Sequence, residues 1–506
     1  MHDGHALPPP QRGEGEPRSR ARLPSPTETS DSASPSETGR FVTGSILRHV
    51  VVMGATGSVG LMAIFAVDLL SLLYVSTLGD PNLTAAVGFA GIVQFFATAV
   101  NIGLMIAAGA LVGKAVGAHD PASARRLSTS ALALGTLVST LIAVLIALCA
   151  EPLLTLIGAR GEALRVATLF LHITLPSNPL LAAGMLFTGL LRAVGAAGQA
   201  MLVTLAGAMV TAFLDPLLIF AAGLGVEGAA ITVCVARVTF VAVGLRDVAR
   251  HGLLGRPRGA DLRADALALA VVAGPAILTN LAPSAASAFL ARLYAGYGAE
   301  AVAAASVIDR LTPVAFCGLF ALSGAIGPIL AQNWGAGRFD RMRGVLRNAA
   351  GVTLAYASVV WLALALGRGP IATLFGLHGV AADLFGFFCQ VGGAIWFFNG
   401  LLFLGNAAFN NLGFPLRSTL LNWGRATLGT IPPGLLGAAL YGPRGVVAGM
   451  GLGSLVFGVL GFLLARRTVD RLEGAGPNLL PTSGTPEAPH RAAPLPVGHA
   501  HPGPAS

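Results

Sequence analysis

Long apolar runs, separated by short polar connections, occupy most of the chain between two polar ends. A helix of about 20 apolar residues is long enough to cross the hydrocarbon core of a bilayer. The pattern therefore predicts an all-α integral membrane protein with twelve transmembrane helices. The expected segments are 46–77, 85–111, 127–149, 166–190, 201–222, 228–245, 267–295, 302–330, 349–366, 384–410, 418–440 and 445–465.

The composition agrees with a membrane protein and argues against a soluble one. Of the 506 residues, 54% are hydrophobic and 11% are charged, whereas soluble domains carry roughly 25% charged residues. The formal charge of +9 at first favours a nucleic-acid partner, but the basic residues lie between the apolar runs. That placement fits membrane topology better, so we expect the lipid bilayer as partner and no nucleic acid.

The chain divides into two lobes flanked by polar tails. The tails, 1–44 and 467–506, are rich in Pro, Ser and charged residues and are predicted to be disordered. An N-terminal six-helix lobe spans 45–246, a linker spans 247–265, and a C-terminal six-helix lobe spans 266–466. Histidines in the second tail would offer metal ligands, but disorder is the stronger prediction. The four cysteines show neither metal-ligand nor disulfide-framework spacing.

The connections between the apolar runs alternate in charge. One set, which includes the linker, is rich in arginine and lysine, and the other holds only Arg160, Arg165, Arg368 and Arg444. The positive-inside rule places the basic set in the cytoplasm. We therefore expect a multi-pass protein of the plasma (inner) membrane with both termini in the cytoplasm.

The two halves of the sequence repeat. Gly117-Ala118, which precedes a basic pair, matches Gly335-Ala336 before Arg341 and Arg343, and further landmarks share this offset of about 218 residues. Each half has six predicted helices, so both halves enter the membrane in the same direction. This is a parallel repeat related by an axis along the membrane normal, as in some secondary transporters.

Two acidic residues stand apart from any basic neighbour inside predicted transmembrane helices, Asp68 in 57–74 and Asp215 in 202–222. A third, Asp309 in 302–330, is followed by Arg310, and we expect a structural role for it. A carboxylate in a membrane helix is costly and marks an ion or proton path by default. The repeat places Ala286 and Pro433 at the equivalent positions of the second half, so the scaffold does not need an acid there. The alternatives are a carboxylate that only ties helices together and an Asp-Pro kink.

Both acids are expected at similar depth, roughly 15 and 10 Å from the outer ends of their helices. The proline after Asp215 leaves the carbonyl of Ala212 without its helical donor. Thr211 lies one turn before Asp215, and Thr232 lies near the same end of the next helix. These oxygens suit a proton or a hard cation such as sodium, so we predict one coupled cation site made by Asp68, Asp215, Thr211 and Thr232.

Amide side chains inside the apolar runs are candidates for a substrate cavity. They are Gln94, Asn101, Asn178, Asn399 and Asn406. Membrane amides more often form hydrogen bonds between neighbouring helices, and the sequence leaves both roles open.

Several motifs in order along residues 45–466 resemble those of the multidrug and toxic compound extrusion (MATE) family. The motifs are Ala66-Val67-Asp68, Leu78-Gly79-Asp80-Pro81, Leu111–Ala118, Leu190–Gly195, Leu214–Phe220, Gly225–Ala230 and Gln332–Arg338. The resemblance implies two six-helix lobes around a central cleft. It also implies export of xenobiotic, cationic amphipathic compounds in exchange for protons or sodium, without a cofactor, and we expect a monomer.

The chain departs from the family pattern in the second lobe. Members with acids in that lobe carry a Glu and an Asp near positions that here read Pro283 and Leu401. We therefore expect coupling in the first lobe. Two other functions stay open: a flippase of a lipid-linked precursor from the same superfamily, which intramembrane arginines favour, and a membrane-embedded enzyme. The sequence shows no nucleophile or metal motif for an enzyme.

Overall fold

The computed structural model describes residues 1, 2, 4 and 39–475, and every regular element in this part is helical. The disorder predicted for 5–38 and 476–506 lies outside the described residues. The first half contains α1 (Ile46–Ser76), α2 (Pro81–Gly117), α3 (Pro121–Leu148), α4 (Ala150–Leu156), α5 (Gly161–Thr174), η1 (Leu175–Ser177), α6 (Asn178–Ala193), α7 (Ala197–Pro216), η2 (Leu217–Ala221) and α8 (Gly225–Arg250).

The second half contains α9 (Gly259–Ala295), α10 (Ala299–Ala315), α11 (Cys317–Gly335), α12 (Phe339–Leu374), α13 (Gly379–Asn411), α14 (Pro415–Ala426) and α15 (Ile431–Ala475). Several helices begin at positions that their sequence favours. Asp80 and Asp120 cap α2 and α3 by accepting hydrogen bonds from backbone N–H groups, and a proline occupies the first turn of each.

Among the described residues, ten helical segments are long and apolar enough to cross a membrane, and α10 with α11, bent by 45°, adds an eleventh. One of the ten, Pro415–Gly474, is 60 residues long and contains non-helical backbone at Tyr441 and Gly442. Its two parts run antiparallel, because Gly437 lies against Gly445 and Gly429 against Gly453 with no room for a Cβ. This hairpin crosses twice, so the twelve predicted crossings are present.

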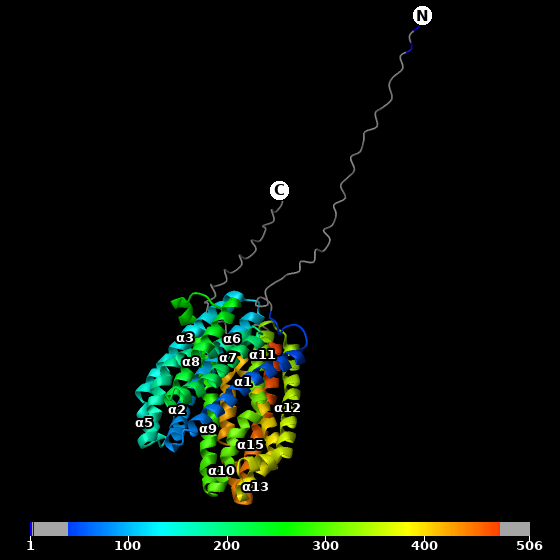
Figure 1. The fold of residues 1–506 in the computed structure, drawn as a ribbon. Coiled ribbons are helices and arrows are strands. Elements are labelled where there is room, and N and C mark those ends of the chain that lie inside the picture. Colours follow the sequence, from blue (N-terminus) through cyan, green and yellow to red (C-terminus); the bar gives the residue numbers. More distant parts are fainter. Residues whose placement is uncertain (3, 5–38, 476–506) are drawn as a thin grey trace, which may run out of the picture. The chain divides into compact units, whose positions relative to one another are not determined.

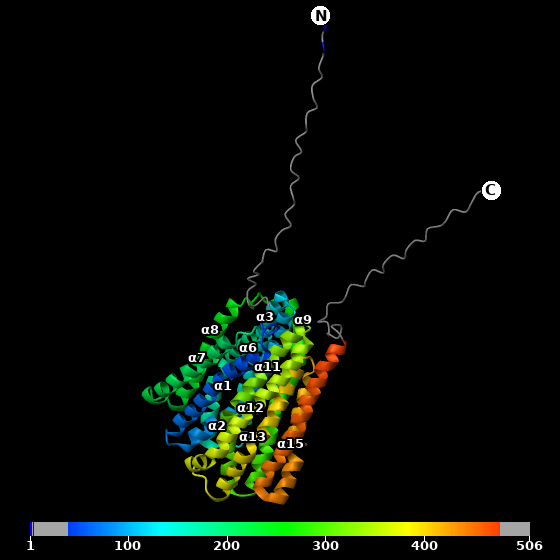
Figure 2. The same ribbon diagram turned by 90° about the vertical axis from the view of Figure 1, so that its right-hand side faces the viewer.

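The helices form two lobes (Figures 1 and 2), with α1–α8 gathered on one side and α9–α15 on the other. Within the first lobe α2 packs on α6 and α7 on α8, and within the second α13 packs on α12 and α15. The lobes meet where α1 contacts α11 and where α2 contacts α9 and α11.

The contact between the lobes reflects the internal repeat. Gly117 of α2 lies against the backbone of Gln332, and its repeat equivalent, Gly335 of α11, lies against the backbone of Lys114. Neither glycine has space for a Cβ, so only glycine allows the two helix backbones to approach this closely. We call this end of the helices, where α1 begins and α2 and α11 end, the basic end. It is the end predicted to be cytoplasmic.

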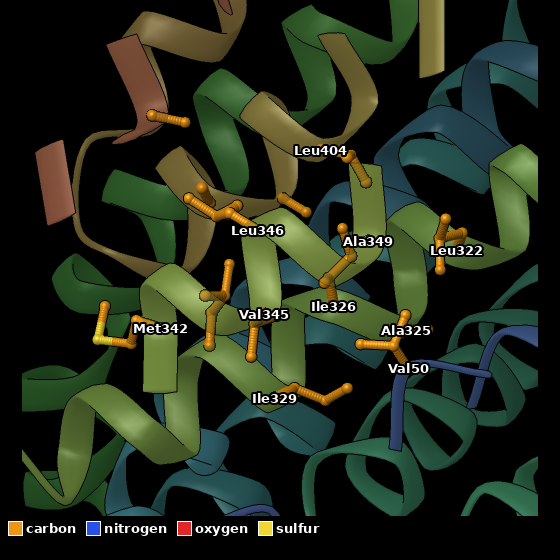
Figure 3. Packing of buried hydrophobic residues seen from close by; sticks show 14 of the residues in the cluster. Val50, Leu322, Ala325, Ile326, Ile329, Met342, Val345, Leu346, Ala349 and Leu404 are labelled. Carbon is orange, nitrogen blue, oxygen red and sulfur yellow. The ribbon is translucent and has the colours of Figure 1, made fainter. Parts of the chain in front are cut away.

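The largest buried apolar cluster sits at the basic end and includes residues of both lobes. Figure 3 shows Val50 of α1 beside Ala325 of α11, and Val345 and Leu346 of α12 belong to the same cluster. The first helix therefore contributes to the core of the second lobe as well as to its own.

Three predicted boundaries need correction. Residues 39–44, expected in a disordered tail, are placed against both lobes, and 467–475 continue α15. The linker is shorter than 247–265, because α8 continues to Arg250 and α9 begins at Gly259. Polar residues at helix ends resemble a loop in a composition window, which is why the sequence ends α8 and α15 too early and begins α9 too late.

Candidate functional site

The relative position of α1 and α7 determines which polar groups meet. Gly60 of α1 packs against Thr204 of α7, and Ser71 of α1 donates a hydrogen bond to the Asp215 carboxylate on α7. The two contacts share one residue offset, so the helices run parallel. Asp68 is thus level with Ala212, three residues or roughly 4.5 Å along the axis from Asp215.

Asp215 is enclosed by the first lobe. The residue is only 1% exposed. Its Oδ2 accepts the hydrogen bond from Ser71, while its Oδ1 is buried and has no hydrogen-bond partner among the described residues. A buried acceptor without a partner is costly, so the free oxygen is the natural place for a proton or a cation.

Asp68 differs from Asp215 in access. Its side chain is exposed, yet it is close enough to Asp215 for the two charges to interact. Asp68 and Ser71 are three residues apart, so both project from neighbouring positions on the face of α1 that meets α7. The pair therefore combines an accessible carboxylate with an enclosed one.

The two threonines of the predicted site have different surroundings. Thr232 of α8 is fully buried beside Asp215, and its hydroxyl donates to the Gly228 carbonyl at 3.1 Å. Thr211 donates to the Gly207 carbonyl one turn back. No hydrogen bond between Thr211 and either carboxylate occurs in the described part of the chain.

The helix changes its winding immediately after Asp215. α7 ends at Pro216 and continues as the π-helical turn η2, against which Gly228 of α8 packs closely. This irregularity follows from the missing N–H of proline and agrees with the free carbonyl predicted at Ala212. π-turns inside helices are frequent at functional sites.

Chemically, the arrangement can accept a positive charge. Two carboxylates near each other repel, and one proton or one cation between them removes the repulsion. The sequence analysis missed Ser71, which is the direct link between α1 and Asp215. Its spacing of one helical turn from Asp68 could have pointed to it. Serine is common in membrane helices, however, so this spacing alone does not single it out.

Comparison with known proteins decides the family. The MatE family model matches the chain twice, over residues 58–217 and 275–435. The matched segments start 217 residues apart and end 218 apart, which is the repeat offset found in the sequence. The chain belongs to the MatE family.

The protein is therefore a MATE transporter and not an enzyme. It is 28% identical over 431 residues to the FAD transporter of Shewanella oneidensis, an alignment that covers 84% of this chain and 95% of that protein. It is 23% identical over 415 residues to the multidrug export protein MepA of Staphylococcus aureus strain NCTC 8325, covering 80% and 90% of the two chains.

Solved MATE structures share the fold. The Vibrio cholerae transporter VcmN in its bent form matches with a TM-score of 0.81 at 23% identity, over 85% of this chain and 98% of that one. An outward-facing multidrug resistance MATE transporter matches with a TM-score of 0.80 at 21% identity, over 87% and 99%. The predicted MATE-like, all-α fold with two repeats is confirmed.

In the first lobe of this MATE transporter, the predicted substrate amides are engaged within the lobe. Gln94 donates to the Thr174 hydroxyl at 2.6 Å. Arg237 of α8 donates to the Thr174 carbonyl at 2.7 Å and to the Ser177 hydroxyl at 2.8 Å. Arg237 thus satisfies backbone groups at η1, where the helix of the fourth crossing is irregular.

A second network joins Asn101, Asn178 and Ser139. Asn101 donates to Asn178 Oδ1 at 3.3 Å, and Asn178 donates to Ser139 at 2.8 Å. Asn101 Oδ1 is buried without a partner. These contacts tie helices together, and a role of Gln94, Asn101 and Asn178 in substrate binding stays a prediction.

The interior of the second lobe contains amides and an arginine but lacks a carboxylate pair among the described residues. Asn406 accepts a hydrogen bond from Asn422 at 2.8 Å. Asn399 is buried, and its Oδ1 has no partner. One turn from Asn422, the Nε of Arg425 is buried and also unpartnered, and none of the recorded ion pairs involves Arg425.

Four aromatic rings form a cluster in the second lobe. Two come from the start of α11, where Phe316 directly precedes the helix, and two come from α13. Phe316 stacks on Trp396 with ring centroids 5.1 Å apart. Phe320 contacts both Trp396 and Phe403. Trp396 therefore packs against its own lobe.

Proposed function

We propose that the protein is a secondary antiporter that exports amphipathic, drug-like compounds in exchange for protons or sodium ions. The coupling ion binds at Asp68 and Asp215. One observation carries the proposal: the buried Oδ1 of Asp215 has no partner among the described residues, while the exposed Asp68 lies one helix turn from Ser71, the donor to Asp215. The MatE match favours such an exporter over a lipid-linked flippase.

The ion would act through helix movement. A proton or sodium ion that reaches Asp68 removes the repulsion between the two carboxylates. α1 can then move toward α7, guided by the Ser71–Asp215 hydrogen bond. This movement narrows the first-lobe cavity and expels the substrate, so that uptake of the ion drives export.

The family resemblance favours a cationic amphipathic substrate, and relatives named multidrug export proteins support this class. A flavin nucleotide is a second candidate, supported by a relative named FAD transporter whose alignment covers most of both chains. Arg237 is buried, and the Nε of Arg425 is buried without a partner. Neither arginine forms an ion pair in the described part of the chain, so both would suit an anionic group.

Transport in proteoliposomes tests both points. Vesicles that contain the purified protein are loaded with a fluorescent organic cation or with FAD, and pH and sodium gradients are imposed separately. Efflux that follows one gradient identifies the ion, and the cargo that moves identifies the substrate class. If efflux is the same with a pH gradient, with a sodium gradient and with neither, the protein is not a coupled antiporter.

We also propose that the basic end faces the cytoplasm of a plasma-membrane transporter that works as a monomer. Cysteines introduced at Ser36 and Ser483 should resist impermeant labels applied to intact cells. Labelling of either from outside would reverse the orientation, and light scattering in detergent would report the oligomeric state.

A further inference from the structure

A short segment before the first helix bridges the two lobes at the basic end. We call residues Gly39–Gly44 the strap. Its central residue, Phe41, is only 2% exposed and belongs to the same buried cluster as Val50, Leu322 and Ala325. Figure 3 shows how closely Val50 at the start of α1 approaches the helices of the second lobe.

The second lobe holds the strap through its backbone. Arg341 of α12 donates from Nη2 to the carbonyls of Phe41 and Thr43, at 3.0 and 3.1 Å, and from Nη1 to the carbonyl of Gly44 at 3.1 Å. Its Nε donates to Asn333 Oδ1 at 3.1 Å, and Asn333 in turn donates to the Phe41 carbonyl at 3.2 Å. The planar guanidinium thus binds three backbone carbonyls of the strap.

The first lobe holds the same segment from the other side. Arg40 donates from Nη1 to the Gly195 carbonyl at 3.1 Å. The Phe41 ring lies beside Gly195, and Gly39 lies beside Gly117. Gly195 has φ +86°, a conformation that favours glycine and turns its carbonyl toward the strap.

One buried side chain connects all three parts. Gln332 of α11 is fully buried; it accepts a hydrogen bond from the Phe41 N–H at 2.9 Å and donates one to the Ala193 carbonyl at 2.6 Å. These partners define the orientation of the amide, because one is a donor and the other an acceptor. The second lobe, the strap and the first lobe are therefore joined through a single residue.

We propose that the strap is a lock that holds the lobes together at the basic end and must be released before they can part there. Contacts to both lobes cannot survive separation of the lobes, so the strap stabilises the closed arrangement only. The proposal rests on the transport function above, in which access alternates between the two ends.

The lock is present on one side of the repeat axis only. The repeat equivalent of Gln332 is Lys114, whose Nζ lies 4.3 Å from the centre of the Trp334 ring and binds no strap. The segment before α9 instead contacts α3, where Arg125 donates to the Gly252 carbonyl at 2.9 Å. A single segment therefore bridges the lobes at this seam, in addition to the direct Gln332–Ala193 hydrogen bond.

The test measures the distance between the lobes in the full chain. The native cysteines are replaced, and spin labels are attached at Ala122→Cys and Arg347→Cys across the basic end, or at Asn82→Cys and Ala299→Cys across the other end. All four positions are exposed. Double electron–electron resonance in nanodiscs then gives the distance distribution for Phe41→Ala, Arg341→Gln and Gln332→Leu. From it we obtain the open-to-closed ratio, which is the population with the long distance divided by the population with the short one.

We expect each strap variant to raise the open-to-closed ratio at the basic end at least about tenfold. Phe41→Ala loses a buried ring, Arg341→Gln loses charged hydrogen bonds and Gln332→Leu loses buried amide hydrogen bonds. The matched control is Arg343→Gln, because Arg343 lies on the same helix but pairs with Glu473 at 2.5 Å within the second lobe. It should leave the ratio unchanged. A normal melting temperature of each variant shows that it is folded.

Two results would overturn the lock. Unchanged distances in Phe41→Ala and Arg341→Gln, with opening only in Gln332→Leu, would mean that the Gln332–Ala193 contact closes the seam and the strap follows passively. Equal opening in Arg343→Gln would mean a general loss of stability. Neither result depends on cargo, so a failure of the antiport proposal remains distinguishable from a failure of the lock.

Discussion

The two lobes share one scaffold, yet their interiors differ at the equivalent depth. The first lobe has Asp68 on α1 and Asp215 on α7, and Ser71 of α1 donates a hydrogen bond to Asp215. The second lobe has Ala286 at the position equivalent to Asp68, where it packs with Ala282 and Ala426 in a small apolar cluster. The scaffold is therefore stable without an acid at this depth, which argues that the first-lobe acids serve coupling and not folding.

Replacement of the accessible acid should have the largest effect. Asp68→Asn keeps the shape of the side chain but cannot take up and release a proton, so gradient-driven efflux should fall to the level of empty liposomes. Expression should remain normal. Efflux in proteoliposomes measures this, and activity close to that of the unmodified protein would reduce Asp68 to a structural residue.

A matched control separates coupling from burial. Asp265 of α9 is also a buried acid, but Ser130 donates to it at 2.7 Å and Arg126 lies 3.4 Å away at the basic end. Asp265→Asn should lower thermal stability without changing the ion dependence of efflux. If Asp265→Asn abolished ion-dependent efflux, loss of coupling would follow from the loss of any buried acid, and the Asp68→Asn result would not identify a coupling residue.

The next largest effect concerns the pair. We expect the effects of Asp68→Asn and Asp215→Asn to be non-additive if, as proposed, one ion binds at both carboxylates. The measurement is the pH dependence of substrate binding for each single variant and for the double variant. The double variant should bind like the more severe single one, while simple addition of the two effects would make the acids independent sites.

A smaller effect is expected from the link between α1 and α7. Ser71→Ala removes the donor to Asp215 Oδ2 and should weaken coupled efflux about tenfold, since a hydrogen bond to a charged group is worth roughly 1.5–3 kcal/mol. Ser58→Ala is the control, because Ser58 donates only to the Gly54 carbonyl of its own helix. Equal losses in both variants would point to a property of α1 as a whole.

The smallest effect on coupling is expected in the second lobe. Arg425→Gln removes a cation without a recorded ion pair and should leave the ion dependence of efflux unchanged. If an anionic cargo contacts this lobe, its apparent KM should rise several-fold, whereas the KM of a cationic cargo should not. Loss of ion dependence would show that coupling is shared between the lobes.

The sequence by itself determined the features that depend on short stretches of chain. The length of each apolar run specifies a membrane crossing, the constant offset reveals two repeats, and an isolated carboxylate in an apolar helix marks the candidate site for a coupling ion. Even the irregular turn after Asp215 follows from its neighbour Pro216. These are local properties, so one sequence is enough to predict them.

Only the tertiary structure decided which groups meet. The Ser71–Asp215 hydrogen bond depends on the register of α1 against α7, and the engagement of Gln94 and Asn406 depends on helix rotation. The strap is the clearest case, because Phe41 and Arg341 lie 300 residues apart. Such partners are selected by packing across the lobes, and no periodicity within a single segment contains that information.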